Sequence, residues 1–267
     1  MSHPSAQWAR RYAGQCPDPA VRLFCFPYAG AGASVYRDWR LPRTDAEVWA
    51  VQPPGRENRT GEPPIRRIEP LLEGYAAGLG HLLDRPFAFF GHSLGALVAF
   101  ELTRLMRRRG GPRPAYLFLS ARRAPGRPAK RGPVSGLAQE EFLARLSAMA
   151  GSSQSVVRDR ELLIALAPLM RADFEVCETY RYRPERPIDV PVRCYAADDD
   201  SEVDPDDVAA WRDYTTGRCD LRLFTGGHLF LRDHGRQLMA DVAAALADIP
   251  PSLATPGSRR VLPQYLR

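Results

Sequence analysis

The sequence predicts an α/β protein built on one mostly parallel sheet. Short apolar runs rich in Val, Phe, Leu and Tyr alternate with helical patterns along the chain. The runs are almost continuously apolar, which is typical of strands covered by helices on both faces. A length of 267 residues, 45% of them hydrophobic, is enough for one large core.

Six apolar runs are predicted to be strands, and four amphipathic segments supply the helical connections. The predicted strands are Val21–Phe26, Glu47–Val51, Phe87–Phe90, Tyr116–Ser120, Val192–Ala196 and Leu221–Phe224. The predicted helices are Ile68–Leu83, Ala96–Arg109, Asp206–Thr215 and Gly235–Asp248.

One interval interrupts this alternation. Residues 122–187 contain no convincing strand; they open with the Pro/Gly/Arg-rich loop APGRPAKRGPVSG and continue with helical patterns at Gln139–Met149 and Asp159–Tyr180. A helical insertion after a strand, at the edge where active sites of such sheets form, predicts a lid. We therefore expect a core of residues 1–121 and 188–250, a helical lid of residues 122–187, and a disordered tail of residues 251–267.

Composition and charge exclude several classes of protein. The net charge of +6 is spread along the chain, with no helix-turn-helix or RNA-binding signature, so no nucleic-acid partner is expected. The N-terminus lacks the apolar core of a signal peptide and no apolar stretch is long enough for a membrane span, which predicts a cytoplasmic protein without a membrane partner. The five cysteines form no CxxC pair or Cys/His cluster, so neither a zinc site nor a disulfide framework is expected.

The strongest local motif is FFGHSLGA, in which Ser93 is the serine of a G-x-S-x-G sequence. It follows an apolar strand directly and precedes a helix, the arrangement of a nucleophile elbow that exposes the serine hydroxyl above the sheet. Gly91 and Gly95 let the strand and the helix approach each other closely. The context predicts Ser93 to be a catalytic nucleophile.

A serine nucleophile needs a positioned base, and in this type of fold the histidine comes last in the chain. His3 and His81 precede the serine, and His92 lies in the elbow itself, where packing is the expected role. His228 follows the last predicted strand by one short glycine loop, whereas His234 lies near the start of the next helix. His228 is therefore the predicted base.

The acid is expected in the loop after the preceding strand, where an aspartate could fix the histidine tautomer. Residue types alone do not choose among the carboxylates there, which are Asp198, Asp199, Asp200, Glu202 and Asp204.

The loop FPYAGAGAS after the first strand offers a further component of the site. The backbone N–H groups of Ala29 and Leu94 are predicted to form an oxyanion hole.

Taken together, these motifs resemble the type II thioesterases, enzymes of the α/β-hydrolase superfamily associated with polyketide and nonribosomal peptide synthases. The matching stretches are LFCFPYAGAGASVYRDW, VWAVQPPGREN, FAFFGHSLGALVAFELTRLM, VDPDDVAAWRDYT and LRLFTGGHLFLRDH, in the order of the family. The family register, counted back from Trp211, places the acid at Asp200, with Asp198 as the alternative. Tyr28 departs from the histidine that is frequent in the family, which implies an altered pocket mouth and substrate preference.

The resemblance implies a serine thioesterase that hydrolyses acyl groups from the phosphopantetheine arm of an acyl or peptidyl carrier protein and so removes stalled or aberrant chains in antibiotic biosynthesis. It implies no metal or other cofactor, and a monomer is expected. Carrier proteins are commonly acidic, so a basic run is a candidate docking surface; it consists of Arg122, Arg123, Arg127, Lys130 and Arg131.

Three other functions remain open at this point. The same triad hydrolyses oxygen esters, so a carboxylesterase or lipase is one alternative. A non-catalytic protein that binds acyl carriers is the second, and an acyltransferase to an alcohol or amine is the third.

Overall fold

The computed structural model describes residues 8–12, 19–41, 45–150, 160–247 and 249. Its centre is a seven-stranded sheet in the order β1-β3-β2-β4-β5-β6-β7. All neighbouring strands are parallel except β1, which is antiparallel to β3. The strands are β1 Ala9–Arg10, β2 Val21–Phe26, β3 Ala46–Val51, β4 Phe87–His92, β5 Tyr116–Ser120, β6 Val192–Ala197 and β7 Cys219–Phe224. The predicted α/β-hydrolase type of fold is confirmed.

The strand order reverses between β2 and β4. The chain passes from β2 outward to β3 and returns to β4 on the other side of β2, with Phe26 paired to Gly91 at the carboxyl end. Loops that leave neighbouring strands in opposite directions open a crevice at such a switch point, which is where ligands bind in open α/β sheets. The loop after β2 and the elbow after β4 both lie there.

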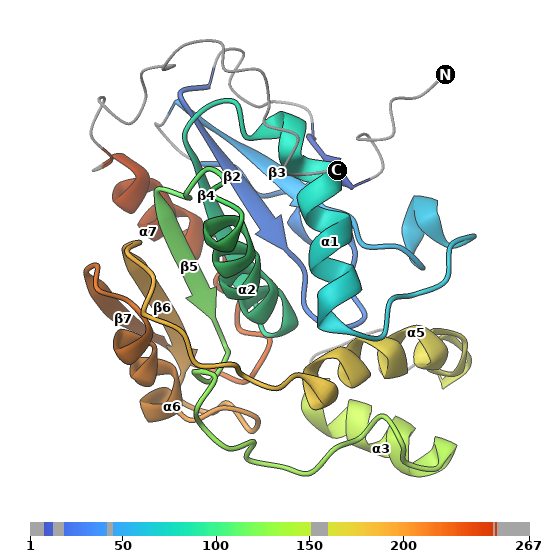
Figure 1. Ribbon diagram of the computed structural model, residues 1–267. Helices are drawn as coiled ribbons and strands as arrows, with labels where there is room; N and C mark the ends of the chain where they lie inside the picture. The colour runs from blue at the N-terminus through green and yellow to red at the C-terminus, as the bar shows by residue number, and fades with distance from the viewer. Residues whose placement is uncertain (1–7, 13–18, 42–44, 151–159, 248, 250–267) are drawn as a thin grey trace.

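Helices cover both faces of the sheet (Figure 1). Helices α1 (Ile68–Leu79) and α2 (Leu94–Arg108) pack on one face against Phe24, Phe26 and Phe89. Helix α7 (Gly235–Ala247) packs on the other face. The strand side chains that meet it alternate with the first set; they are Leu23, Cys25 and Phe90. This burial on both faces explains the continuous apolar runs in the sequence.

Helices α3 (Gln139–Ala150) and α5 (Arg160–Thr179) lie beyond the carboxyl ends of the central strands (Figure 1). They share a small apolar core of their own, formed by Phe142, Leu143, Leu146, Leu163 and Ala167. The segment between β5 and α3 is irregular. The helical insertion thus occupies the position predicted for a lid, and its gating role stays a prediction. The tail of residues 251–267 lies outside the described residues.

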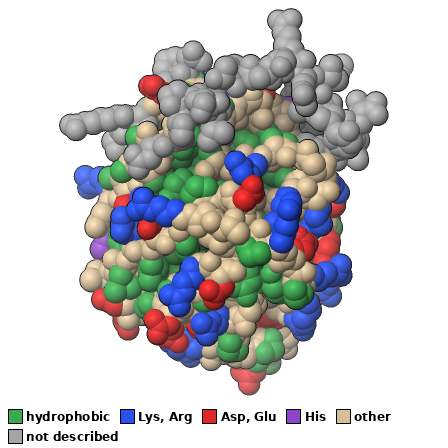
Figure 2. All heavy atoms as spheres, turned by 60° about the vertical axis from the view of Figure 1, so that its left-hand side comes forward, with side chains coloured by type: hydrophobic (Ala, Val, Ile, Leu, Met, Phe, Trp, Pro, Cys, Tyr) green, Lys and Arg blue, Asp and Glu red, His purple; other side chains and the backbone are tan. Residues whose placement is uncertain are grey.

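The predicted elements differ from the observed ones mainly at their ends. Helix α1 continues as a 3₁₀ turn (Gly80–Leu82), and α6 is only Pro205–Ala209, followed by a 3₁₀ turn over Ala210–Tyr214. No sequence pattern indicates β1, because two residues show no periodicity, and none indicates the 3₁₀ turns Ala33–Tyr36 and Glu57–Arg59. On the face shown in Figure 2, acidic and basic side chains are interspersed, with no large patch of one sign.

Candidate active site

Ser93 lies on a strained turn between β4 and α2. Its backbone has φ 54° and ψ −111°, a conformation rarely adopted outside glycine. The turn is possible because two glycines remove side chains: a Cβ on Gly91 would lie 2.1 Å from the Gly95 carbonyl oxygen, and one on Gly95 would lie 2.0 Å from that of Phe26. The strain and the close approach are those expected of a nucleophile elbow.

The structure brings Ser93, His228 and Asp200 together from three separate loops. Ser93 Oγ lies 3.0 Å from His228 Nε2, and His228 Nδ1 lies 2.8 Å from Asp200 Oδ2. A carboxylate oxygen only accepts hydrogen bonds, so His228 Nδ1 carries the proton and donates it to Asp200. His228 Nε2 is therefore free to accept the serine proton. This is the relation of nucleophile, base and acid in serine hydrolases.

Asp200 is held in its ionised form. Burial alone would raise its pKa, but the hydrogen bond and charge of His228 and the backbone N–H of Glu202 outweigh burial and leave the pKa lowered. Its Oδ1 also accepts the N–H of Val203 at 3.2 Å. Asp198, the alternative acid, is exposed and accepts the Gly226 N–H at 2.9 Å instead. Of the two candidates, only Asp200 reaches His228 in the structure.

His92 has a different place from His228. It is fully buried, with Nδ1 2.9 Å from Ser120 Oγ and Nε2 2.8 Å from the backbone carbonyl of His228. Because a carbonyl oxygen only accepts, His92 Nε2 carries the proton and Nδ1 accepts from the Ser120 hydroxyl. Burial, aided by the nearby His228, lowers the His92 pKa to about 3. His92 therefore stays neutral and holds the backbone at His228.

The two predicted oxyanion donors flank Ser93. Leu94 is the first residue of α2, where backbone N–H groups lack partners within the helix, and Ala29 lines the same cavities as Ser93. Among the described residues, neither N–H has a hydrogen-bond partner. The arrangement leaves both available to a substrate oxygen, and their role stays a prediction.

An ion pair that the sequence did not reveal fixes the loop carrying Ala29. Asp173 of α5 and Arg56 are both buried and meet in a two-pronged contact, with N–O distances of 2.6 and 2.9 Å. The same Asp173 carboxylate accepts the N–H of Gly30 at 2.7 Å, and Arg56 also donates to the Ala31 carbonyl. A helix of the lid is thus tied directly to the residue after Ala29. The two partners are far apart in sequence, which is why no local pattern indicated them.

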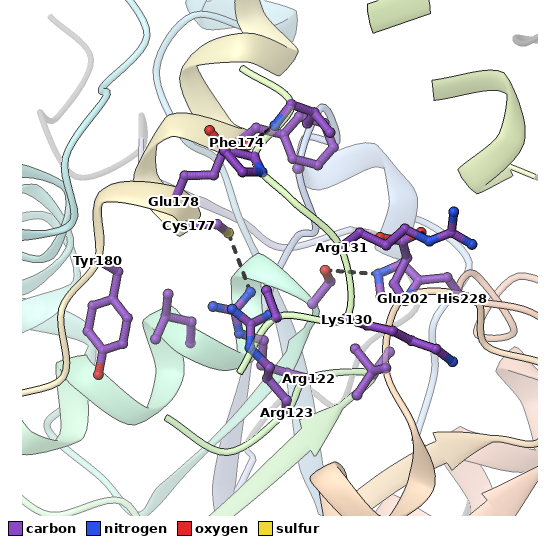
Figure 3. A pocket seen from close by; sticks show the side chains of 18 of the residues that line it. Arg122, Arg123, Lys130, Arg131, Phe174, Cys177, Glu178, Tyr180, Glu202 and His228 are labelled. Carbon is purple, nitrogen blue, oxygen red and sulfur yellow. Dashed lines mark hydrogen bonds and ion pairs between the residues drawn. The ribbon is translucent and has the colours of Figure 1, made fainter. Parts of the chain in front are cut away.

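Two cavities meet at Ser93 and His228. The first has a volume of about 490 Å³ and carries more cations than carboxylates. Its cations are Arg122, Arg123, Lys130, Arg131, Arg145 and Arg181, and its carboxylates are Glu178 and Glu202. Figure 3 shows Arg122 and Arg123 in this cavity, with Arg122 beside Cys177. The second, of about 230 Å³, is mainly apolar; its lining from the lid helices is Leu146, Met149, Leu163, Leu166, Met170 and Phe174. One side of the serine is therefore suited to a polar or anionic group and the other to a hydrocarbon.

The members of the basic run, which spans residues 122–131, have different partners in the structure. Lys130 lies 2.7 Å from Asp204, Arg131 lies 3.5 Å from Glu202, and Arg127 lies 3.8 Å from Asp207. Arg122 is buried, and its guanidinium contacts the Cys177 thiol at 3.5 Å. Arg123 donates to the Arg127 carbonyl.

In the described residues, no group of three or more His, Cys, Asp or Glu side chains is arranged to hold a metal ion. Within the same ranges, no helix is long and apolar enough to cross a membrane. Cys25 and Cys194 are buried free thiols, as their apolar runs predicted. Cys16 and His3 lie outside the described residues.

Comparison with known proteins gives one consistent family. The family model described as the thioesterase domain matches residues 21–246. The gramicidin S biosynthesis protein GrsT of Aneurinibacillus migulanus is 38% identical over 213 residues, which cover 79% of this chain and 83% of GrsT. Thioesterase PikA5 of Streptomyces venezuelae is 38% identical over 241 residues, which cover 90% of this chain and 85% of PikA5.

A solved structure agrees in fold as well as in sequence. The type II thioesterase BorB from the borrelidin biosynthetic cluster superposes with a TM-score of 0.82 at 35% identity. The match covers 92% of this chain and 100% of BorB. The similarity therefore extends over the sheet, the elbow and the helical insertion together.

Proposed function

Because this chain belongs to the thioesterase domain family, we propose that it is a serine hydrolase in which Ser93 attacks the thioester carbonyl, assisted by His228 and Asp200. The observation that carries the proposal is the continuous chain of contacts from Ser93 Oγ to His228 Nε2 at 3.0 Å and from His228 Nδ1 to Asp200 at 2.8 Å. Of its relatives, GrsT is a gramicidin S biosynthesis protein, PikA5 is a thioesterase, and BorB is a type II thioesterase from the borrelidin biosynthetic cluster. The chain is an editing thioesterase of polyketide or nonribosomal peptide biosynthesis.

The first half of the reaction transfers the acyl group to the enzyme. His228 Nε2 accepts the hydroxyl proton of Ser93 while Oγ bonds to the carbonyl carbon. The oxygen that becomes negative is held by the N–H groups of Ala29 and Leu94; losing one such donor typically lowers the rate by about 10²–10³-fold. The carbon–sulfur bond then breaks, and the sulfur leaves as a thiol with the proton from His228.

The second half repeats the chemistry with water. His228 takes a proton from a water molecule, the resulting hydroxide attacks the acyl-serine carbonyl, and Ser93 leaves with that proton. The products are a carboxylic acid and regenerated enzyme. Asp200 stays ionised throughout and stabilises the imidazolium form of His228. The proposed cycle consists of proton transfers and nucleophilic attack and calls on no metal or redox cofactor.

The two cavities support a carrier-bound substrate. We place the acyl group in the apolar 230 Å³ cavity under α3 and α5 and the phosphopantetheine arm in the basic 490 Å³ cavity. A thioester must lie where both cavities meet, which is at Ser93. The amide groups and phosphate of the arm suit the arginines there better than they suit the apolar side.

A matched pair of substrates tests this proposal. The rates of hydrolysis are measured for an acyl thioester of pantetheine and for the corresponding oxygen ester, each with the wild type and with Ser93→Ala. We expect the wild type to prefer the thioester and Ser93→Ala to lose at least about 10⁴-fold in rate. A preference for the oxygen ester would instead favour a carboxylesterase, and full activity in Ser93→Ala would exclude the serine mechanism.

A further inference from the structure

A shared wall of residues stands between the apolar cavity at Ser93 and a third, larger cavity. The larger cavity has a volume of about 1080 Å³ and extends along the loop after β2 and the start of α7. Both cavities are lined by the same five residues: Tyr28, Gly30, Ala31, Leu166 and Arg232. Gly30 and Ala31 contribute little side chain, so Tyr28, Leu166 and Arg232 form most of the barrier.

The barrier is closed by a contact between two side chains. Arg232 donates to the Tyr28 hydroxyl oxygen from Nε at 2.9 Å and from Nη2 at 2.6 Å. Its guanidinium carbon also lies 5.6 Å from the centre of the Tyr28 ring. In the described part of the chain, no carboxylate lies within ion-pair distance of Arg232. Tyr28 is thus the partner that holds this arginine across the wall.

Tyr28 itself is held firmly. Its ring is buried and packs edge-on against His92, with the ring centres 5.7 Å apart. Arg232, in contrast, is exposed and lies in the turn that follows His228. The Tyr28 ring is therefore held in place by its buried surroundings. The exposed Arg232 side chain is the part of the wall that can be removed without opening the core.

We propose that the Tyr28–Arg232 contact is the end wall of the acyl site and limits the length of the acyl chain that the enzyme accepts. This inference rests on the proposed function, because it takes the apolar cavity to be the acyl site. A space of about 230 Å³ holds roughly seven groups of about 30 Å³, the share of one water molecule in the liquid. A short chain fits in front of the wall, and a long chain meets the Arg232–Tyr28 pair.

Removing the wall has a consequence that depends on chain length. An acyl group that ends in front of Arg232 gains no new space from its removal, so its rate is the reference for the longer chains. A longer chain gains access to the large cavity and buries additional methylene groups. Burial of two or more further methylenes corresponds to a gain in kcat/KM of about tenfold or more.

The test compares acetyl, hexanoyl and dodecanoyl thioesters of pantetheine with the wild type, Arg232→Ala and Tyr28→Phe. Arg236→Ala is the matched control, because Arg236 carries the same charge and lines the large cavity but not the acyl cavity. We expect Arg232→Ala to raise kcat/KM for dodecanoyl about tenfold relative to acetyl. Tyr28→Phe keeps the ring and loses the hydroxyl that holds Arg232, so a smaller shift in the same direction is expected. Arg236→Ala should keep the wild-type profile.

The outcomes separate this inference from the proposed function. If the wild type hydrolyses none of the three thioesters, the proposed function fails and the inference fails with it. If the wild type is active but Arg232→Ala changes all three rates by the same factor, only the end wall is refuted.

Discussion

The carboxylate of Asp173, in helix α5 of the predicted lid, accepts the backbone N–H of Gly30 at 2.7 Å, one residue after Ala29. Gly30 has a φ of 80°, so the chain turns sharply at this point. Arg56 lies 2.6 Å from this carboxylate and neutralises its charge. Because the two charges are paired, both side chains can be buried. Burial alone would lower the Arg56 pKa, but the Asp173 charge outweighs it and raises the pKa. The lid helix and the loop of the predicted oxyanion hole are therefore one connected unit.

Loss of Asp173 is expected to destabilise the protein and to lower its activity. Asp173→Ala leaves the buried Arg56 without its partner, which typically lowers the free energy of unfolding by about 3–5 kcal/mol. Glu175→Ala, on the same helix, is the control, because its ion pairs with Arg66 and Arg67 lie at the surface and should contribute little to stability. Urea unfolding of both variants measures the difference. Equal destabilisation would contradict the assigned role of the buried pair.

Asp200 and Asp198 are expected to differ sharply in their effect on turnover. Asp200→Asn replaces the carboxylate that fixes the His228 tautomer, and kcat should fall by about 10⁴-fold. Asp198→Asn changes a solvent-exposed side chain that bonds to Gly226, and kcat should stay within about twofold. Steady-state kinetics on a pantetheine thioester distinguish the two. A large loss in Asp198→Asn with an active Asp200→Asn would reverse the assignment of the acid.

Charge reversal at Arg127 and Lys130 tests whether the basic run docks a carrier protein. Both side chains are about half exposed. We expect Arg127→Glu together with Lys130→Glu to raise KM for a carrier-bound acyl group roughly fivefold, corresponding to about 1 kcal/mol. The KM for a small pantetheine thioester should rise much less, because that substrate reaches Lys130 in the cavity but has no protein surface to meet Arg127. If both substrates respond alike, the effect lies in the site and the docking role is wrong.

His92 makes stability depend on pH. Its pKa is about 3 in the folded protein and about 6.5 in an unfolded chain, so below about pH 6.5 only the unfolded state binds a proton there. The free energy of unfolding should therefore fall as pH decreases from about 6.5 towards 3, by up to about 1.4 kcal/mol per pH unit from this group. The lowered pKa of Asp200 acts in the same direction at the acid end of this range.

Urea unfolding of the wild type and of His92→Gln between pH 7 and 4 measures this contribution. Glutamine can contact Ser120 and the His228 carbonyl without titrating. The slope of stability against pH should become shallower in His92→Gln, whatever its stability at pH 7. An unchanged slope would show that His92 is not the group responsible.

The sheet and the elbow could be predicted because their signals are local. The strands of the sheet are mostly apolar runs, and the motif of Gly91, Ser93 and Gly95 stands directly between a strand and a helix. The choice between Asp198 and Asp200 could not be made from residue type, because both are aspartates in the same loop. The resemblance to the family, counted back from Trp211, was needed to select Asp200. Only the three-dimensional structure shows which carboxylate the His228 ring reaches.

The parts that could not be predicted depend on distant contacts. Asp173 and Arg56 are 117 positions apart, and a single aspartate in an amphipathic helix gives no sign of being buried. Arg232 and Tyr28 are 204 positions apart in the sequence, and only the fold brings them into contact. The basic run was predicted as one surface, yet the structure divides it into a buried Arg122 and an outer group paired with aspartate and glutamate side chains.

The proposed function requires that Ser93 releases acyl groups from a carrier protein. It is tested most directly by intact-protein mass spectrometry of an acylated, phosphopantetheinylated carrier protein incubated with the wild type and with Ser93→Ala. We expect the wild type to remove the acyl mass and leave a free phosphopantetheine thiol, while the carrier stays acylated with Ser93→Ala. Retention of the acyl mass with correctly folded wild type, or equal release by both proteins, would contradict it.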